Sequence, residues 1–261
     1  MHSKNLLSRK NVRTLWATLS HKAVLVFDYD GTLAPIAEDP DRAKMRKTTQ
    51  HRLRLLAKQY PVYILTGRET QDAKRHLPIR ALKGVIGNHG LDWPGALNRR
   101  EARRRVTRWK AALTPIFSKI PGVWLEGKKI SLSVHFAPTA AATVIKHLAK
   151  LEVPRKIPGR NVMNLLPSRR FDKGSAVRKI LKKGSYRSFL FVGDDATDEA
   201  VYRGKYSVPS VQVHVANSQS SAPYGLKNQK EIDRLLDELL AMARRRGRNL
   251  HNLSRGVRLS K

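Results

Sequence analysis

Short apolar runs alternate with amphipathic stretches along most of this 261-residue chain. Runs at residues 24–27, 61–65, 84–87, 188–192 and 211–215 are rich in β-branched and aromatic residues, and they predict buried strands. Apolar residues at helical spacing predict helices around 53–57, up to about residue 76, over 174–182, and from 229 to about 245. Because strands and helices alternate, the pattern predicts an α/β protein with a doubly wound parallel sheet.

The alternation is interrupted between residues 93 and 167. Helices are predicted there over 98–117 and 139–151, and strands over 122–125, 130–136 and 161–165. These elements predict a small α+β cap domain inserted into a Rossmann-like core. The core then comprises residues 1–92 and 168–247, and the basic tail 248–261 is expected to be disordered.

The first 22 residues contain no acidic residue and lack the apolar stretch of a secretory signal. A basic amphipathic helix is favoured there, and a transit peptide is the alternative. The apolar positions that predict this helix are Leu6, Leu7, Leu15, Trp16 and Leu19.

Composition and charge narrow the class of protein. The absence of cysteine excludes disulfides and thiolate chemistry, and no apolar stretch is long enough to cross a bilayer. We therefore expect a cytoplasmic protein without membrane association, and a monomer. The net charge of +32 predicts weak, non-specific binding of polyanions through the basic surface and the arginine-rich tail.

The apolar run at 24–27 leads directly into Asp28, Tyr29, Asp30 and Gly31. Two carboxylates at the C-terminal end of a strand suit covalent catalysis, with one as nucleophile and the other transferring protons. The pattern alone is weak, because aspartate and glycine are common in turns.

A second acidic group lies near the other end of the chain. Asp194, Asp195, Asp198 and Glu199 fall within six positions, although the chain has only 20 acidic residues. Carboxylates this close repel one another unless a cation or a helix N-terminus compensates, and oxygen ligands favour Mg²⁺. The alternative is that Asp195, Thr197 and Asp198 cap a helix.

Reactive groups thus follow the predicted strands in the order Asp28 and Asp30, Thr66, Lys173, then Asp194 and Asp195. A parallel sheet brings such positions to one edge, and the arrangement resembles the haloacid dehalogenase superfamily of phosphatases. The resemblance implies that Asp28 forms an aspartyl-phosphate and that Asp30 is the general acid and then the base. It also implies that Thr66 and the Gly67 N–H bind the phosphate and that Lys173 neutralises it.

By the same resemblance, Asp28, Asp194 and the backbone carbonyl of Asp30 bind Mg²⁺, and Asp195 supports the ion directly or through water. Within the superfamily the chain is similar to trehalose-6-phosphate phosphatases. The residues that carry this similarity are Phe27–Leu33, Thr66–Arg68, His89–Gly90, Glu126–Lys128, Ser131, Val134–Phe136 and Gly193–Ala200.

That similarity implies that the sugar phosphate is bound by Arg68, His89, Glu126, Lys128, His135 and, at a position where the family has glutamate, Asn164. The family also tends to have arginine where this chain has Ala137. These two departures keep open another substrate, such as a glycosylglycerate phosphate or a hexose phosphate. A polyanion-binding protein on a phosphatase fold is the third hypothesis.

Overall fold

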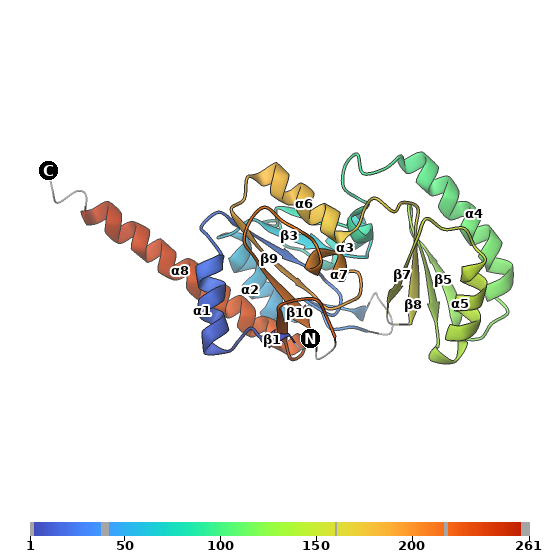
Figure 1. Cartoon of the computed structure of the whole chain (residues 1–261), viewed down its shortest axis with the longest axis horizontal. Coiled ribbons are helices and arrows are strands. Elements are labelled where there is room, and N and C mark those ends of the chain that lie inside the picture. Colours follow the sequence, from blue (N-terminus) through green and yellow to red (C-terminus); the bar gives the residue numbers. More distant parts are fainter. Residues whose placement is uncertain (1–2, 38–41, 160, 217–218, 257–261) are drawn as a thin grey trace.

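The computed structural model describes residues 3–37, 42–159, 161–216 and 219–256, with side chains as far as Arg246. Two β-sheets organise the molecule (Figure 1), and the smaller sheet lies at the end away from the C-terminus. None of the helices in the described part of the chain is both long and apolar enough to cross a membrane.

The larger sheet has seven parallel strands in the order β1-β11-β10-β9-β2-β3-β4. Its strands are β1 (Lys4–Asn5), β2 (Ala23–Phe27), β3 (Val62–Leu65), β4 (Gly84–Ile86), β9 (Ser188–Gly193), β10 (Ser210–Val215) and β11 (Tyr224–Leu226). Every residue of β2 is buried, because helices cover both faces of the sheet. The predicted doubly wound parallel sheet is therefore confirmed.

Successive residues of a strand point to opposite faces, so β2 contributes to two hydrophobic clusters. Leu25 and Phe27 pack with the helices on one face, and Val24 and Val26 pack with those on the other. The first face is covered by α1 (Arg9–Thr18), α2 (Lys47–Ala57), α3 (Thr70–His76) and α8 (Ile232–Gly256), and the second by α6 (Lys173–Gly184) and α7 (Glu199–Tyr202).

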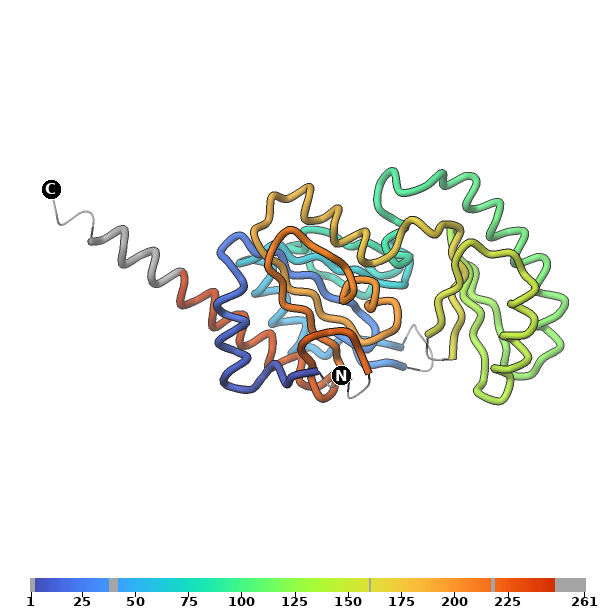
Figure 2. The backbone as a smooth tube through the Cα atoms, in the orientation of Figure 1, coloured from blue at the N-terminus to red at the C-terminus, as the bar shows by residue number. Residues whose placement is uncertain are grey.

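The ends of the chain differ in part from the prediction. The predicted amphipathic N-terminal helix is present as α1, with Leu15 buried, but a two-residue strand precedes it. Helix α8 continues to Gly256, so the expected disordered tail is wrong for residues 248–256. Figure 1 shows this helix running away from the core, and Figure 2 shows its coloured part passing beside α1. Residues 257–261 of the predicted tail lie outside the described residues.

The smaller sheet is antiparallel, with the order β5-β6-β8-β7. It comprises β5 (Val123–Gly127), β6 (Leu132–Phe136), β7 (Arg155–Gly159) and β8 (Val162–Leu166), together with helices α4 (Arg99–Phe117) and α5 (Ala141–Ala149). The sequence did not predict β7, because proline, here Pro158, is unusual within a strand. Pro158 is tolerated in β7 because β7 is an edge strand, which needs fewer N–H donors.

One face of the cap sheet is apolar and the other is polar. Val134 and Leu132 pack with Trp109 and Leu113 of α4 and with Val144 of α5. These helices lie on the side of the sheet that is turned away from the core (Figure 1). The open face of the cap sheet is therefore turned toward the carboxyl ends of the core strands.

We predict that Leu15→Ala lowers the free energy of unfolding by about 2–5 kcal/mol, because it leaves a cavity where α1 packs on the sheet. Urea denaturation measures the change. The exposed neighbour Thr14 provides the control, since Thr14→Ala should change stability by less than about 0.5 kcal/mol. Equal effects of the two substitutions would show that α1 is not part of the core.

Candidate active site

The carboxylate of Asp28 lies at the carboxyl end of the central strand β2. Its backbone N–H donates to the Val192 carbonyl of the adjacent strand at 2.8 Å, and the residue is 4 % exposed. Gly31 follows with φ of +78°, and a Cβ at this position would collide with the carboxylate of Asp194. Glycine therefore permits the two acidic segments to approach closely.

The second acidic segment follows β9 and folds around Asp198. The Asp198 carboxylate is completely buried and accepts the backbone N–H groups of Asp194 at 2.9 Å and Asp195 at 3.0 Å. Asp198 stands at the N-cap position of α7 but makes no side-chain cap hydrogen bond, so the capping interpretation is wrong for this residue. The Asp195 side chain does make a local hydrogen bond to the backbone, because its Oδ1 accepts the N–H of Thr197 at 2.8 Å.

Lys173 joins the acidic groups from the first turn of α6. Its ammonium, on a side chain only 1 % exposed, lies 2.7 Å from Asp198 Oδ1, 3.1 Å from Asp28 Oδ1 and 3.9 Å from Asp195 Oδ1. Asp172 fixes the start of the helix, since its carboxylate accepts the Ser175 N–H in a capping box. The structure thus brings Asp28, Lys173, Asp194 and Asp195 together, as the sequence predicted.

The negative charge of this cluster exceeds what one lysine compensates. Burial, together with the neighbouring carboxylates, raises the pKa of Asp194 to about 8 and that of Asp198 to about 6. Burial also raises the pKa of Asp28, against the opposing effect of Lys173. Burial alone would lower the pKa of Lys173, but the surrounding carboxylates raise it, so the lysine remains charged.

The donor set fits a hard divalent cation. One carboxylate oxygen each from Asp28, Asp194 and Asp198 lies within 4.8 Å of the other two. All three donors are oxygens, which Mg²⁺ prefers, and a dication would relieve the repulsion that raises their pKa values. The ligands expected from the resemblance were Asp28, the Asp30 carbonyl, Asp194 and Asp195. Asp198 was part of the same acidic run, but nothing in the spacing showed that its side chain turns back toward the strand end.

Asp30 lies beside the cluster and binds Arg68. The guanidinium donates from Nε to Asp30 Oδ2 at 2.8 Å and from Nη2 to Oδ1 at 2.7 Å, and it also contacts Asp72. Arg68 was expected to face the sugar phosphate, but in the structure it is 6 % exposed and orients Asp30. Its two-pronged contact fixes the plane of the Asp30 carboxylate.

Thr66, Gly67 and His89 form the opposite wall of the site. Thr66 follows β3 and is completely buried, and its carbonyl accepts the His89 N–H at 2.9 Å. A Cβ at Gly67 would lie 2.6 Å from the His89 ring, so glycine allows this close packing. His89 has a positive φ of 55°, and its buried Nδ1 has no hydrogen-bond partner. Burial and nearby Lys173 lower the pKa of His89 to about 3, which keeps the ring neutral.

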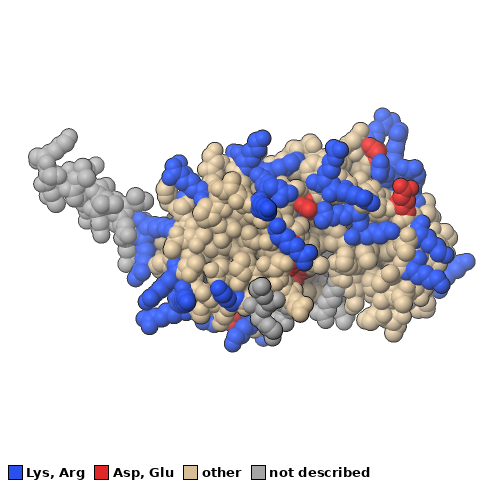
Figure 3. Space-filling view, viewed as in Figure 1, with Lys and Arg blue, Asp and Glu red and all other residues tan. Residues whose placement is uncertain are grey.

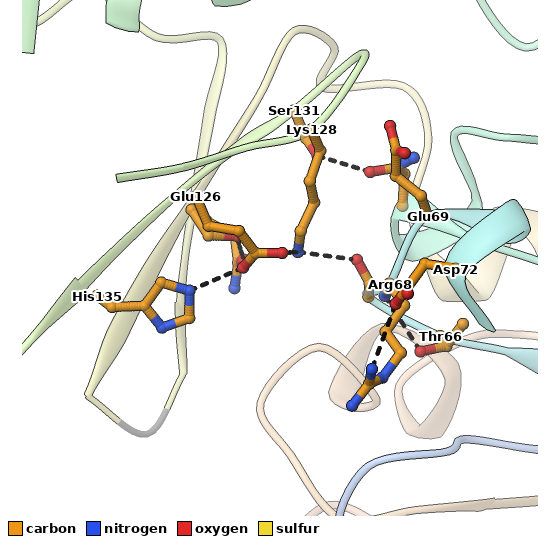
Figure 4. A network of polar contacts seen from close by, with 12 residues as sticks. Thr66, Arg68, Glu69, Asp72, Glu126, Lys128, Ser131 and His135 are labelled. Atoms are coloured by element: carbon orange, nitrogen blue, oxygen red, sulfur yellow. Dashed lines mark hydrogen bonds and ion pairs between the residues drawn. The ribbon is translucent and has the colours of Figure 1, made fainter. Parts of the chain in front are cut away.

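The cap contributes a row of charged side chains (Figure 4). His135 Nε2 lies 2.8 Å from Glu126 Oε2, Glu126 Oε1 lies 3.6 Å from the Lys128 ammonium, and that ammonium donates to the Gly67 carbonyl at 3.2 Å. Burial would raise the pKa of Glu126, but His135 and Lys128 lower it to about 2. Glu126 in β5 and Lys128 just after its end lie close enough to pair, as expected from their spacing of two.

Two further contacts connect cap and core. Glu69 accepts the Lys129 N–H at 2.5 Å, and the buried Ser131 hydroxyl donates to Asn88 Oδ1 at 2.6 Å.

Asn164 accepts the Ser133 hydroxyl at 2.8 Å within the cap sheet and is 8 % exposed. Ala137 lies against Gly122 at the far end of β6, where its N–H donates to the Gly122 carbonyl.

Comparisons with known proteins agree with this geometry. The chain is 28% identical to trehalose-phosphate phosphatase B of Arabidopsis thaliana, an alignment that covers 88% of this chain and 69% of that protein. It is also 28% identical to trehalose 6-phosphate phosphatase RA3 of Zea mays, covering 86% of this chain and 72% of that protein.

Solved structures share the fold. The C-terminal domain of the C. albicans trehalose-6-phosphate phosphatase matches with a TM-score of 0.73 and 20% identity, covering 93% of this chain and 99% of that one. The structure of a trehalose-6-phosphate phosphatase related protein matches with a TM-score of 0.69 and 21% identity, covering 85% and 99%. The sequence model of the trehalose-phosphatase family matches residues 26–231, from β2 through the cap to the segment before α8. This chain is therefore a member of the trehalose-phosphatase family, phosphoric monoester hydrolases with the haloacid dehalogenase fold.

Proposed function

We propose that this protein is a Mg²⁺-dependent phosphatase that hydrolyses trehalose 6-phosphate to trehalose and inorganic phosphate in the cytoplasm. The observation that carries the proposal is the convergence of Asp28, Lys173 and Asp194 at one sheet edge, facing Glu126 and Lys128 of the cap. The proposed catalytic groups of the core thus lie near charged groups of the cap, which contacts the core through Lys128. The names of the related proteins support trehalose 6-phosphate as the substrate.

In the proposed reaction Asp28 attacks phosphorus and forms an aspartyl-phosphate, which water then hydrolyses. Asp30 protonates the leaving sugar oxygen and afterwards accepts a proton from the water, while Arg68 holds its carboxylate in place. Lys173 supplies fixed positive charge to the phosphoryl oxygens. The Thr66 hydroxyl and the Gly67 N–H bind them from the opposite wall.

Magnesium would be held by Asp28, Asp194 and the Asp30 carbonyl, Asp195 would support the ion, and the Asp198 carboxylate is close enough to offer a further oxygen. The ion supplies neutralisation of the phosphate dianion, which otherwise repels the attacking carboxylate. The cap residues Glu126, Lys128, His135 and Asn164 would bind sugar hydroxyls, and His89 would line the phosphate side of the cleft. Contacts of Lys128 and Lys129 with the core would close the site and exclude water.

A phosphatase for a different sugar phosphate is the alternative within the same chemistry. Asn164 and Ala137 support it, because Asn164 lacks the charge of the glutamate that the family tends to have at this position. Comparing kcat/KM for trehalose 6-phosphate, a glycosylglycerate phosphate and glucose 6-phosphate distinguishes the two proposals. A preference of about tenfold or more, about 1.4 kcal/mol, identifies the substrate.

Binding of polyanions is a second proposed property, and we locate it on the cap. Lys and Arg side chains spread across the face of the molecule in Figure 3. On α4 a surface hollow of about 840 Å³ is lined by Arg99, Arg100, Arg103, Arg104, Thr107 and Arg108. Such a concentration of guanidinium groups suits a chain of phosphates.

We predict that Asp28→Asn lowers the rate of phosphate release from trehalose 6-phosphate by a factor on the order of 10³ or more, because an amide is a poor nucleophile. Circular dichroism should show an unchanged fold. Asp237 is the matched control, since it is half exposed and pairs with Arg52 between α2 and α8. Asp237→Asn should retain full activity, and undiminished turnover by Asp28→Asn would rule out the nucleophile.

We predict that stabilisation by Mg²⁺ increases as the pH rises from about 5 to about 8. Protons compete with the metal for Asp194 and Asp198, whose pKa values are raised to about 8 and about 6. For the same reason the metal-free protein loses stability as these groups ionise, because their folded pKa values exceed the unfolded ones. Thermal unfolding with Mg²⁺ and with EDTA at both pH values measures the effect. An equal Mg²⁺-induced increase in the unfolding temperature at pH 5 and pH 8 would contradict the prediction.

We predict that replacing Arg100, Arg104 and Arg108 by glutamine weakens binding of a single-stranded oligonucleotide and makes it less salt-dependent. Turnover of trehalose 6-phosphate should be unchanged, because these side chains lie on the outer helix of the cap. Replacing the exposed Arg9, Lys10 and Arg13 of α1 by glutamine removes the same charge elsewhere and serves as control. If both triple variants weaken oligonucleotide binding equally, binding depends on net charge alone and not on the surface of α4.

A further inference from the structure

Trp124 is exposed in an unusual place for a large apolar side chain. It lies in β5 with 51 % of its surface exposed, while its neighbours Val123 and Leu125 pack against the helices of the cap. Because side chains alternate along a strand, Trp124 projects from the opposite face, together with Glu126. This is the polar face of the cap sheet, which is turned toward the core.

The indole ring is held in a fixed orientation. Trp124 is the cross-strand partner of His135, and the two rings stack with centroids 4.7 Å apart and planes 6° apart. His135 is itself held by Glu126 at 2.8 Å. One face of the indole is therefore covered by the imidazole, and the rest of the ring contributes to the exposed surface.

A continuous row of contacts leads from Trp124 into the active site. It runs from Trp124 to His135 and Glu126, then to Lys128, and ends at the Gly67 carbonyl beside the phosphate-binding wall. Trp124 lies four positions before Lys128, which corresponds to about 13 Å along an extended chain. The row thus extends from the phosphate site over the length of two sugar rings, not of one.

The chemistry of the row also changes along its length. The end near the core carries an ammonium and a carboxylate, which bind hydroxyl groups, and the far end carries a flat apolar ring. A pyranose has one face of C–H groups that packs on such a ring, while its equatorial hydroxyls point outward to polar partners. The other exposed large apolar side chains of the cap, Ile116 and Ile145, lie on α4 and α5.

We propose that the Trp124 indole is the stacking platform for the second, phosphate-distal sugar ring, and that it selects disaccharide phosphates over monosaccharide phosphates. The inference rests on the proposed sugar-phosphate phosphatase function and adds a specificity-determining residue to it. A hexose phosphate fills the site only as far as Glu126 and Lys128, so it gains nothing from Trp124.

The test compares kcat/KM of the wild type and Trp124→Ala for trehalose 6-phosphate, glucose 6-phosphate and p-nitrophenyl phosphate. We expect Trp124→Ala to lose about tenfold on trehalose 6-phosphate and less than about twofold on the two smaller substrates. Retained activity on p-nitrophenyl phosphate shows that the variant is folded. Trp124→Phe should recover most of the loss, because it restores an aromatic face.

Ile145→Ala is the matched control, because Ile145 is 52 % exposed but lies on the helix side of the cap. It should leave all three substrates unaffected. A wild type that prefers trehalose 6-phosphate, with the same preference in Trp124→Ala, would overturn the inference and leave the proposed function intact. A wild type without any preference for the disaccharide phosphate would overturn the inference together with the proposed substrate.

Discussion

The buried ammonium of Lys173 is the interaction on which the arrangement of the active site depends. It contacts Asp28 from the first catalytic segment and Asp198 from the last, although these residues are far apart in the sequence. This charge offsets part of the repulsion among the desolvated carboxylates, although their pKa values remain raised. Asp198 in turn fixes the backbone of Asp194 and Asp195 through their N–H groups. One lysine thus stabilises both the proposed nucleophile and the loop that would hold the metal.

Core and cap have different physical tasks. The core places three carboxylates so close together that they suit a divalent cation. The cap instead presents paired charges and stacked aromatic rings on an open sheet face. One face of the cap sheet can be polar because the other face forms the hydrophobic core of the cap with α4 and α5. Lys128 connects the two parts, since it pairs with Glu126 and also donates to the Gly67 carbonyl of the core. The proposed sugar-binding and phosphate-binding groups therefore meet at one loop.

The sequence predicted the parallel sheet and the clustering of Asp28, Lys173 and Asp194, because long apolar runs and strand-end polar groups have strong local signals. It missed β1 and β11, which have two and three residues and show no periodicity. The partner of Arg68 was also missed, since a bidentate contact with Asp30 depends on how the β3 loop turns in space. The sequence left Asp198 open between an acidic cluster that needs a cation and a helix cap, because N-cap residues and buried metal-site carboxylates look the same in a sequence. Trp124 gave no signal, because only the strand pairing places it beside His135.

Trapping the phosphoryl group tests the central claim most directly. The enzyme is mixed with trehalose 6-phosphate that carries a radiolabelled phosphoryl group, and the reaction is quenched in acid within a single turnover. The account predicts a transient covalent label on the peptide that contains Asp28, formed only in the presence of Mg²⁺. A label on another peptide, or phosphate release during a complete turnover without any covalent label, would contradict it.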